Sequence, residues 1–353
     1  MPVKKPVLAV LLFFIVSRLL FCGPREERKQ LSMAPRGPGP QLAGSLSFSP
    51  EGEGQPPPEG SPGASPASGL SPAAAAQGSA DRGEAVMKAL AAAYPGRLGP
   101  AEYRDGDWAV LLRTFGIPQG AWFYYAEGRF LPEELRDSFR DYDPQPFYTY
   151  RSELPPWTPP TAEEAARMRE REKQRQAHPA KRSQHFYDAL WRAHSRSESW
   201  DRIKQIRFLG HPVMVHFSIL EELSLVEERI LGEAKTNPRV RQWMETLNSV
   251  DGWNWRSIAA TQSRSFHAYG TALDLIPKSQ GGLETYWLWT ARTNPEWWTV
   301  PYSRRLHPPE EVVRAFESFG FIWGGKWPAY DTMHFEYRPE ILIYSGMAPT
   351  DLR

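Results

Sequence analysis

The chain has 353 residues, of which 41% are hydrophobic, and its 42 Lys and Arg side chains nearly balance its 41 Asp and Glu side chains, for a formal net charge of +1. That balance gives no overall charge that would favour a nucleic-acid partner. At about 100 to 200 residues per domain, the length allows two domains or one domain with long appendages.

The first residues have the pattern of an export signal. Two lysines precede an apolar run from Pro6 to Ser17, which is shorter than the about 20 apolar residues of a membrane-spanning helix. We therefore predict a signal peptide over 1–22, with a short membrane anchor as the alternative. The only cysteine, Cys22, resembles the lipid-modified cysteine of bacterial lipoproteins in its position, although Phe21 departs from the small residue usual before it. The signal or this lipid would be the only contact with a membrane.

Residues 23–83 are rich in Pro, Gly, Ser and Ala and almost free of aromatic residues. Such a composition cannot bury enough apolar area to offset its ordering entropy, so we predict a disordered linker that acts as a tether. Order is expected to begin near Glu84, and residues 84–185 are predicted to form an aromatic-rich N-terminal module. Within that module, Thr161–Lys181 has the alternating charge of a solvated polar helix, with a basic patch for an acidic polymer as the alternative.

The second half, 186–345, has the pattern of an α+β domain. A strand is predicted at His211–His216, followed by an amphipathic helix at Ser218–Lys235. Asn237, with proline at the first helical position after it, predicts the capped start of the next helix. Further strands are predicted at 254–260, 271–276 and 333–338, and a further helix at 309–320. We expect a small antiparallel sheet flanked by helices.

The stretch SFHAYGTALD, Ser265–Asp274, contains two candidate metal ligands. His267 and Asp274 could face one ion if the chain turns at Gly270, which has no side chain to obstruct the reversal. This spacing alone also fits two polar residues near a loop. Zinc in hydrolases is typically held by three His, Asp or Glu side chains, with a fourth position left for water.

The stretch DTMHFE, Asp331–Glu336, contains the other candidates. His334 and Glu336 lie two apart on a predicted strand and therefore share a face. Asp331, at the entrance of that strand, could reach the same cavity. A carboxylate beside a zinc-activated water is what a general base requires.

Together these stretches resemble a known family. SFHAYGTALD matches the Ser-x-His-x2-Gly-x-Ala-x-Asp signature, and GFIWGGKW with DTMHFE matches the closing signature, of the zinc D-alanyl-D-alanine carboxypeptidases. These include the vancomycin-resistance dipeptidases and the L-alanyl-D-glutamate endolysins. The resemblance covers 208–339 and implies that His267, Asp274 and His334 bind zinc. It also implies that Asp331, where many members have glutamate, is the catalytic base.

The resemblance further implies an arginine that holds a substrate or transition-state oxygen. Arg256 in NWRS is the first candidate and Arg264 the reserve, because the planar guanidinium can bind a carboxylate through two hydrogen bonds or stabilise an oxyanion. A surface salt bridge is the alternative for Arg256. Ser265 is expected in a turn or beside a ligand. Glu336 is expected to orient a ligand or to pair with a cation, and Trp327 to form a wall of the cleft.

The predicted function is hydrolysis of a peptide bond in the peptidoglycan stem by an exported zinc metallopeptidase of the cell envelope, periplasmic or membrane-anchored. The patterns leave two reactions open, a D,D-carboxypeptidase and an L-Ala-D-Glu-type endopeptidase, because the choice depends on loops such as the tryptophan-rich segment 278–305. That segment fits either a substrate-binding wall or a packed aromatic insertion. The alternative function is a non-catalytic cell-wall-binding lipoprotein that keeps the peptidase fold.

Overall fold

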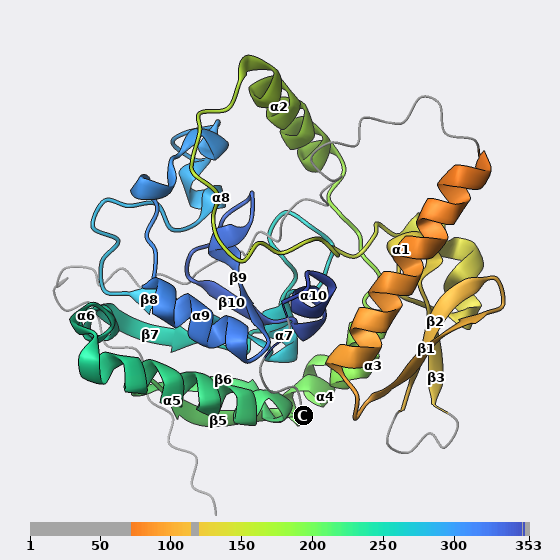
Figure 1. Ribbon diagram of the computed structural model, residues 1–353, viewed down its shortest axis with the longest axis horizontal. Coiled ribbons are helices and arrows are strands. Elements are labelled where there is room, and N and C mark those ends of the chain that lie inside the picture. Colours follow the sequence, from red (N-terminus) through yellow and green to blue (C-terminus); the bar gives the residue numbers. More distant parts are fainter. Residues whose placement is uncertain (1–71, 114–119, 348, 350–353) are drawn as a thin grey trace, which may run out of the picture. The chain divides into compact units, whose positions relative to one another are not determined.

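The computed structural model describes residues 72–113, 120–347 and 349 (Figure 1). The predicted signal over 1–22, with Cys22, and residues 23–71 of the predicted linker lie outside the described residues. Among the helices that the structure describes, none is long and apolar enough to cross a membrane.

The first described element is α1 (Pro72–Ala93), which starts within the segment predicted as a linker. Proline suits the first helical position, and the alanines that follow it have the highest helix propensity of all residues. The part of α1 that packs into the core lies nearer its C-terminus, where Val86, Met87 and Leu90 are fully buried.

Helix α1 packs against an antiparallel meander, a four-stranded sheet in the order β1-β2-β3-β4 (Figure 1). The amino-acid pattern does not predict this sheet, because its strands are short and β1 contains a register shift that interrupts the alternation of apolar residues. The elements in this half are β1 (Leu98–Arg104), β2 (Asp107–Leu112), β3 (Ala121–Tyr124), η1 (Ala126–Gly128), β4 (Leu131–Pro132), η2 (Glu133–Asp141), α2 (Ala162–Ala177), α3 (His185–Trp191) and α4 (Arg196–Trp200).

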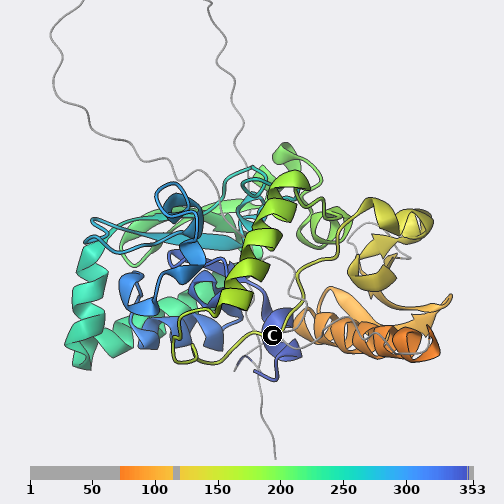
Figure 2. The same cartoon turned by 90° about the horizontal axis from the view of Figure 1, so that it is seen from above.

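Helix α2 is the polar helix predicted over Thr161–Lys181, and it follows residues 144–160, which form no helix or strand (Figure 2). A capping box starts it: the Glu164 amide donates to the Thr161 hydroxyl at 3.2 Å, and the Thr161 amide donates to the Glu164 carboxylate at 2.8 Å. None of its residues is buried. The helix is nevertheless attached to the tryptophan-rich segment, since the Arg175 guanidinium lies 4.5 Å from the Trp287 ring centroid.

The second half has a central four-stranded sheet in the order β7-β8-β10-β9 and a two-stranded hairpin of β5 and β6, all antiparallel. Helices α5 and α9 pack against each other beside this sheet (Figure 1). The mixture of helices and small antiparallel sheets confirms the predicted α+β class. The elements are β5 (Ile203–Phe208), β6 (His211–His216), η3 (Phe217–Ile219), α5 (Leu220–Thr236), α6 (Pro238–Thr246), β7 (Leu247–Asp251), α7 (Phe266–Tyr269), β8 (Ala272–Pro277), α8 (Trp287–Thr290), η4 (Trp297–Thr299), η5 (Tyr302–Arg304), α9 (Glu310–Ser318), β9 (Phe321–Trp323), η6 (Gly324–Lys326), β10 (His334–Tyr337) and α10 (Pro339–Tyr344).

The strand predicted at 254–260 is not formed. Those residues contribute only an isolated antiparallel bridge between Ser257 and Arg264, and the strand of this region is β7, which lies earlier in the chain. A register shift between Leu247 and Ser249 interrupts the alternation within β7, and this hides the strand in the sequence.

One hydrophobic core extends from the N-terminal module into the central sheet. Leu90 of α1, Phe123 of β3, Leu273 of β8 and Phe335 of β10 all belong to the same buried cluster. This buried cluster therefore includes side chains from both sides of residue 185.

Candidate metal centre

Strands β8 and β10 bring two of the candidate ligands together. Asp274 and His334 are directly opposed across this antiparallel pair, so their side chains lie on the same face of the sheet. His267 comes from α7, whose end is the left-handed Gly270, with φ 73°. A Cβ at that glycine would lie 2.8 Å from the backbone nitrogen of His216. Only glycine fits this turn, which returns the chain from His267 to β8.

The three side chains form a buried cluster. Asp274 Oδ2 lies 3.3 Å from His267 Nε2, and Asp274 Oδ1 lies 3.0 Å from His334 Nδ1. One potential ligand atom from each residue lies within 4.8 Å of the others, and none of the three is more than 5% exposed. Two imidazoles and one carboxylate are the donor set of many catalytic zinc sites. The residues present therefore fit the zinc ion that the sequence predicts.

The outer nitrogen of each histidine is held by an acceptor. His267 Nδ1 lies 2.5 Å from the Gly252 carbonyl oxygen, and His334 Nε2 lies 3.2 Å from Glu336 Oε2. With a metal ion bound at the cluster, the outer nitrogens would donate to the Gly252 carbonyl and to Glu336. The inner nitrogens, which face Asp274, would then be the ligand atoms. Metal-binding histidines commonly have such partners, which fix the tautomer and the ring orientation.

Asp331 lies at the entrance of β10, three residues before His334. It is 3% exposed, and its Oδ1 accepts a hydrogen bond from the Met333 amide at 3.3 Å. Its backbone is fixed by the Gly324 carbonyl at 3.0 Å and by a bridge to Tyr286. Asp331 is not one of the three clustered residues, which fits a base better than a ligand.

The two candidate arginines are placed differently. The Arg264 guanidinium lies 2.6 Å from Asp188 Oδ1 and 2.7 Å from the Ala193 carbonyl, so it is engaged with α3 and the residues after it. The Arg256 carbonyl accepts the Ser265 amide at 3.2 Å, which sets Arg256 beside the start of α7. Ser265 itself is the buried N-cap of α7, where its hydroxyl accepts from the His267 amide at 3.3 Å.

An aromatic side chain packs against the cluster. The Trp327 ring lies 5.4 Å from the His334 ring and is 2% exposed, so it packs directly against a candidate ligand. The start of α8 pairs with the residues before β10, because the Trp287 amide donates to the Tyr330 carbonyl at 2.9 Å. The tryptophan-rich segment is therefore a packed aromatic cluster that adjoins Asp331.

Sequence reasoning missed Asp251. It is directly opposed to Asp274 across β7 and β8, and burial, then the charge of Asp274, raises its pKa. The strand had to be placed at Leu247–Asp251 to find this further carboxylate near the cluster.

It also missed Arg338 and Glu340, which are 1% and 0% exposed. Charged residues at 336, 338 and 340, each two apart, are the visible signal.

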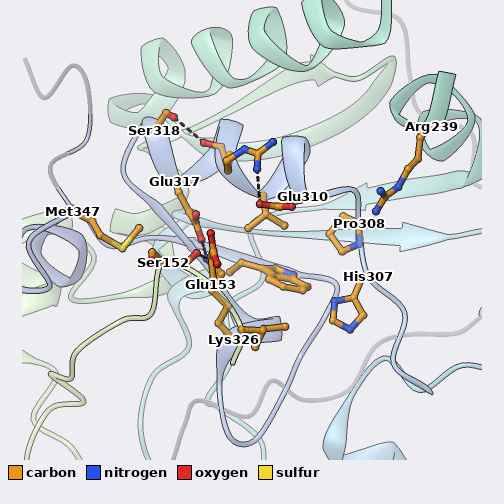
Figure 3. Close-up of a pocket in the computed structure, with 14 residues that line it drawn as sticks. Ser152, Glu153, Arg239, His307, Pro308, Glu310, Glu317, Ser318, Lys326 and Met347 are labelled. Carbon is orange, nitrogen blue, oxygen red and sulfur yellow. Dashed lines mark hydrogen bonds and ion pairs between the residues drawn. The ribbon is translucent and has the colours of Figure 1, made fainter. Parts of the chain in front are cut away.

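A pocket of about 740 Å³ lies between residues 152–154, α9 and the end of η6 (Figure 3). None of the three candidate ligands lines it. Two of its cations face carboxylates, since Lys326 pairs with Glu317 and Arg314 with Glu310. The pocket therefore indicates no particular class of ligand.

Two segments of the chain match known family models. Residues 259–337 match the family model described as D-alanyl-D-alanine carboxypeptidase. The match supports a peptidase of this family. All three clustered residues and Asp331 fall within the peptidase match, whereas Arg256 lies just before it. Residues 86–147 match a domain of unknown function. No curated protein and no solved structure matches the chain.

Proposed function

We propose that this chain is a zinc-dependent hydrolase that cleaves a peptide bond in the peptidoglycan stem, as a D,D-carboxypeptidase or an L-Ala-D-Glu-type endopeptidase. The observation that carries the proposal is the buried cluster of His267, Asp274 and His334 inside the segment that matches the peptidase family. The cluster alone would fit any histidine-rich zinc site. The family match over residues 259–337 is what favours peptide hydrolysis among the reactions such a site could serve.

A zinc ion bound by these three side chains would supply a Lewis acid that polarises the scissile carbonyl and makes a neighbouring water more acidic. The chain's own residues do the rest. The Gly252 carbonyl and Glu336 hold the two imidazole rings in place. Asp331 takes the proton from the attacking water and returns it to the leaving amine, as a general base and then a general acid.

Arg256 is proposed to act on the substrate oxygen. Its guanidinium would donate two hydrogen bonds to the oxyanion or to a terminal carboxylate. Its backbone contact with Ser265 keeps it next to the helix that carries His267. The aromatic cluster beside Asp331 is proposed to form one wall of the substrate site.

Peptidoglycan lies outside the cytoplasmic membrane, so the proposal includes export. The signal pattern over 1–22 and the Pro-rich segment after it support a periplasmic or membrane-anchored enzyme that reaches the wall through a tether. The proposed partner is the stem peptide, and the only membrane contact is through the signal or a lipid on Cys22.

The test combines zinc analysis with digestion of purified sacculi. The wild-type protein should hold one zinc, and mass spectrometry of the muropeptides should show either loss of a terminal D-alanine or cleaved stems. Asp331→Asn should keep the zinc but lower turnover by about 10²- to 10⁴-fold, the usual contribution of a general base.

Three results would contradict the proposal. The wild-type protein could lack zinc, or Asp331→Asn could cleave as fast as the wild type. Binding to sacculi without release of any fragment, with every metal tried, would instead favour the non-catalytic wall-binding protein.

A further inference from the structure

A row of buried charges continues outward from the metal centre. Glu336 accepts from His334 Nε2 through Oε2 at 3.2 Å, and its Oε1 lies 3.2 Å from Arg338 Nη1. Arg338 Nε in turn donates to Glu340 Oε1. We name Glu336, Arg338 and Glu340 the charge chain. All three are at most 1% exposed.

The charge chain ends in contacts from other parts of the molecule. The Glu340 carboxylate accepts the Tyr94 hydroxyl at 2.7 Å and the Tyr187 hydroxyl at 3.1 Å. Arg338 Nη2 donates to the Pro146 carbonyl at 3.3 Å. Tyr94 and Pro146 both belong to residues 86–147, the segment that matches a domain of unknown function.

Arg338 also contacts the segment that carries the other histidine ligand. Its guanidinium lies 4.6 Å from the Phe266 ring centroid, and Phe266 immediately precedes His267. One buried cation therefore adjoins both histidine-bearing elements, β10 through Glu336 and α7 through Phe266. A displacement of Arg338 would disturb both.

Stability alone does not account for this arrangement. Transferring charged groups into a protein interior costs several kcal/mol per ion, and well-packed apolar residues often serve as well or better. The module also has apolar contacts with its neighbour, since the Tyr94 ring packs edge-on against Trp191 at 5.7 Å. What the charges add is a fixed orientation of the Glu336 carboxylate. The planar guanidinium of Arg338 holds one of its oxygens, and the other faces His334 Nε2.

We propose that residues 86–147 of the N-terminal module help to orient the metal centre. Tyr94 and Pro146 hold Glu340 and Arg338 in place. Arg338 in turn holds Glu336 against His334. These are positioning residues, not catalytic ones. The inference rests on the proposed function in taking His334 as a zinc ligand. It adds a role for the module that neither family match assigns.

The test measures zinc affinity apart from activity, on the full chain. Zinc dissociation constants are obtained by competition with a chelating dye, and denaturant unfolding of the metal-free protein gives stability. Arg338→Lys keeps the charge but loses the fork, so the zinc dissociation constant should rise by about tenfold, the lower end for residues that orient a ligand. Tyr94→Phe should raise it in the same direction by a smaller factor, about threefold.

Tyr150→Phe is the matched control. Tyr150 is also a buried tyrosine whose hydroxyl donates to a carboxylate, Glu317 Oε1 at 2.6 Å, and it accepts from the Trp323 amide at 2.9 Å. It does not contact the charge chain. This variant should lose at least as much stability as Tyr94→Phe while its zinc dissociation constant stays within about twofold of wild type.

The outcomes separate the two proposals. Wild type that binds zinc and cleaves stems, with Arg338→Lys and Tyr94→Phe binding zinc equally well, would overturn the positioning role alone. A higher zinc dissociation constant in Arg338→Lys, with no change in Tyr94→Phe, would overturn the proposed role of the N-terminal module and keep that of Arg338. If Arg338→Lys does not fold, Tyr94→Phe decides the question alone. Wild type without zinc affinity would overturn both proposals.

Discussion

The two segments that match family models differ in what they bury. Within 86–147, the buried side chains that the structure describes are almost all apolar or aromatic, with Gln145 as the polar one. Within 259–337, the buried set includes two histidines, Asp274, Asp331 and Glu336, together with several serines and threonines. The interior of the first segment is therefore almost entirely apolar, whereas the interior of the second contains many polar and charged side chains.

Buried polar groups weaken a fold unless each has a partner. For residues 259–337, backbone carbonyls supply some of these partners: the Gly252 carbonyl, just before the segment, faces His267 Nδ1, and the Gly324 carbonyl accepts from the Asp331 amide. The N-terminal module has no such requirement and can supply apolar packing to its neighbour. The difference predicts that equivalent changes in the two segments will have unequal effects.

Glycines at positive φ provide the largest contrast. Gly270 in the metal centre and Gly106 in the turn between β1 and β2 have φ of 73° and 85°. A Cβ at Gly270 would lie 2.5 Å from Ile203 Cδ1 and 2.8 Å from a backbone nitrogen, whereas a Cβ at Gly106 meets nothing within 4 Å. Gly106→Ala should cost about 1 kcal/mol, the strain of the left-handed conformation, and Gly270→Ala at least about 3 kcal/mol.

Denaturant unfolding of the two variants measures these losses. Gly270→Ala should also weaken zinc binding, because the turn sets His267 against Asp274, and Gly106→Ala should leave zinc binding unchanged. Equal losses of stability in the two variants would show that the turn beside the metal centre tolerates a side chain.

A pH effect of nearly the same size is expected from His216, whose amide donates to the Gly270 carbonyl at 2.8 Å. The Ser218 amide donates to its Nδ1 at 3.1 Å, and Nε2 lies 3.0 Å from the Trp191 carbonyl. Burial lowers the pKa of His216 from 6.5 to about 4. Between these values the unfolded chain binds a proton and the folded chain does not, so stability falls as the pH drops through this window.

The fall due to His216 amounts to at most about 3 kcal/mol, at about 1.4 kcal/mol per pKa unit. Unfolding free energies of wild type and His216→Gln, measured from pH 7 to pH 4, isolate this contribution because other titrating groups cancel in the difference. The variant should lose less stability on acidification than the wild type. Parallel curves would mean that His216 becomes protonated in the folded state without penalty.

Local patterns predicted the parts of the molecule that depend on local spacing. The glycine turn between His267 and Asp274 is visible in SFHAYGTALD, and the strand alternation that carries His334 is visible in DTMHFE. That His334 joins Asp274, 60 residues earlier in the chain, was implied by the family resemblance, and the pairing of β8 with β10 brings the two together. The strands β8 and β10 and the helices α5 and α9 were predicted for the same reason. The α+β class followed from them.

Contacts between residues far apart in the sequence could not be predicted from local patterns. Tyr94 and Glu340 are 246 residues apart, and neither has neighbours that mark it as a partner. Strand β7 was missed because a bulge interrupts its alternation, and with it went Asp251. The start of α1 at Pro72 was missed because its first turns contain alanine, which favours a helix but also occurs throughout the Pro-rich segment before it.

The smallest contrast concerns two arginines that lie over tryptophans. Arg175 of α2 lies 4.5 Å from the Trp287 ring centroid beside the metal centre, and Arg104 of β1 lies 4.1 Å from the Trp122 ring in the meander. Each contact should contribute about 0.5 to 1 kcal/mol, so alanine at either position should change stability little. Arg175→Ala should nevertheless raise the KM for muropeptides, because α2 is attached to the aromatic cluster that adjoins Asp331. Arg104→Ala should leave both KM and kcat unchanged, and the same KM in both variants would mean that α2 does not shape the substrate site.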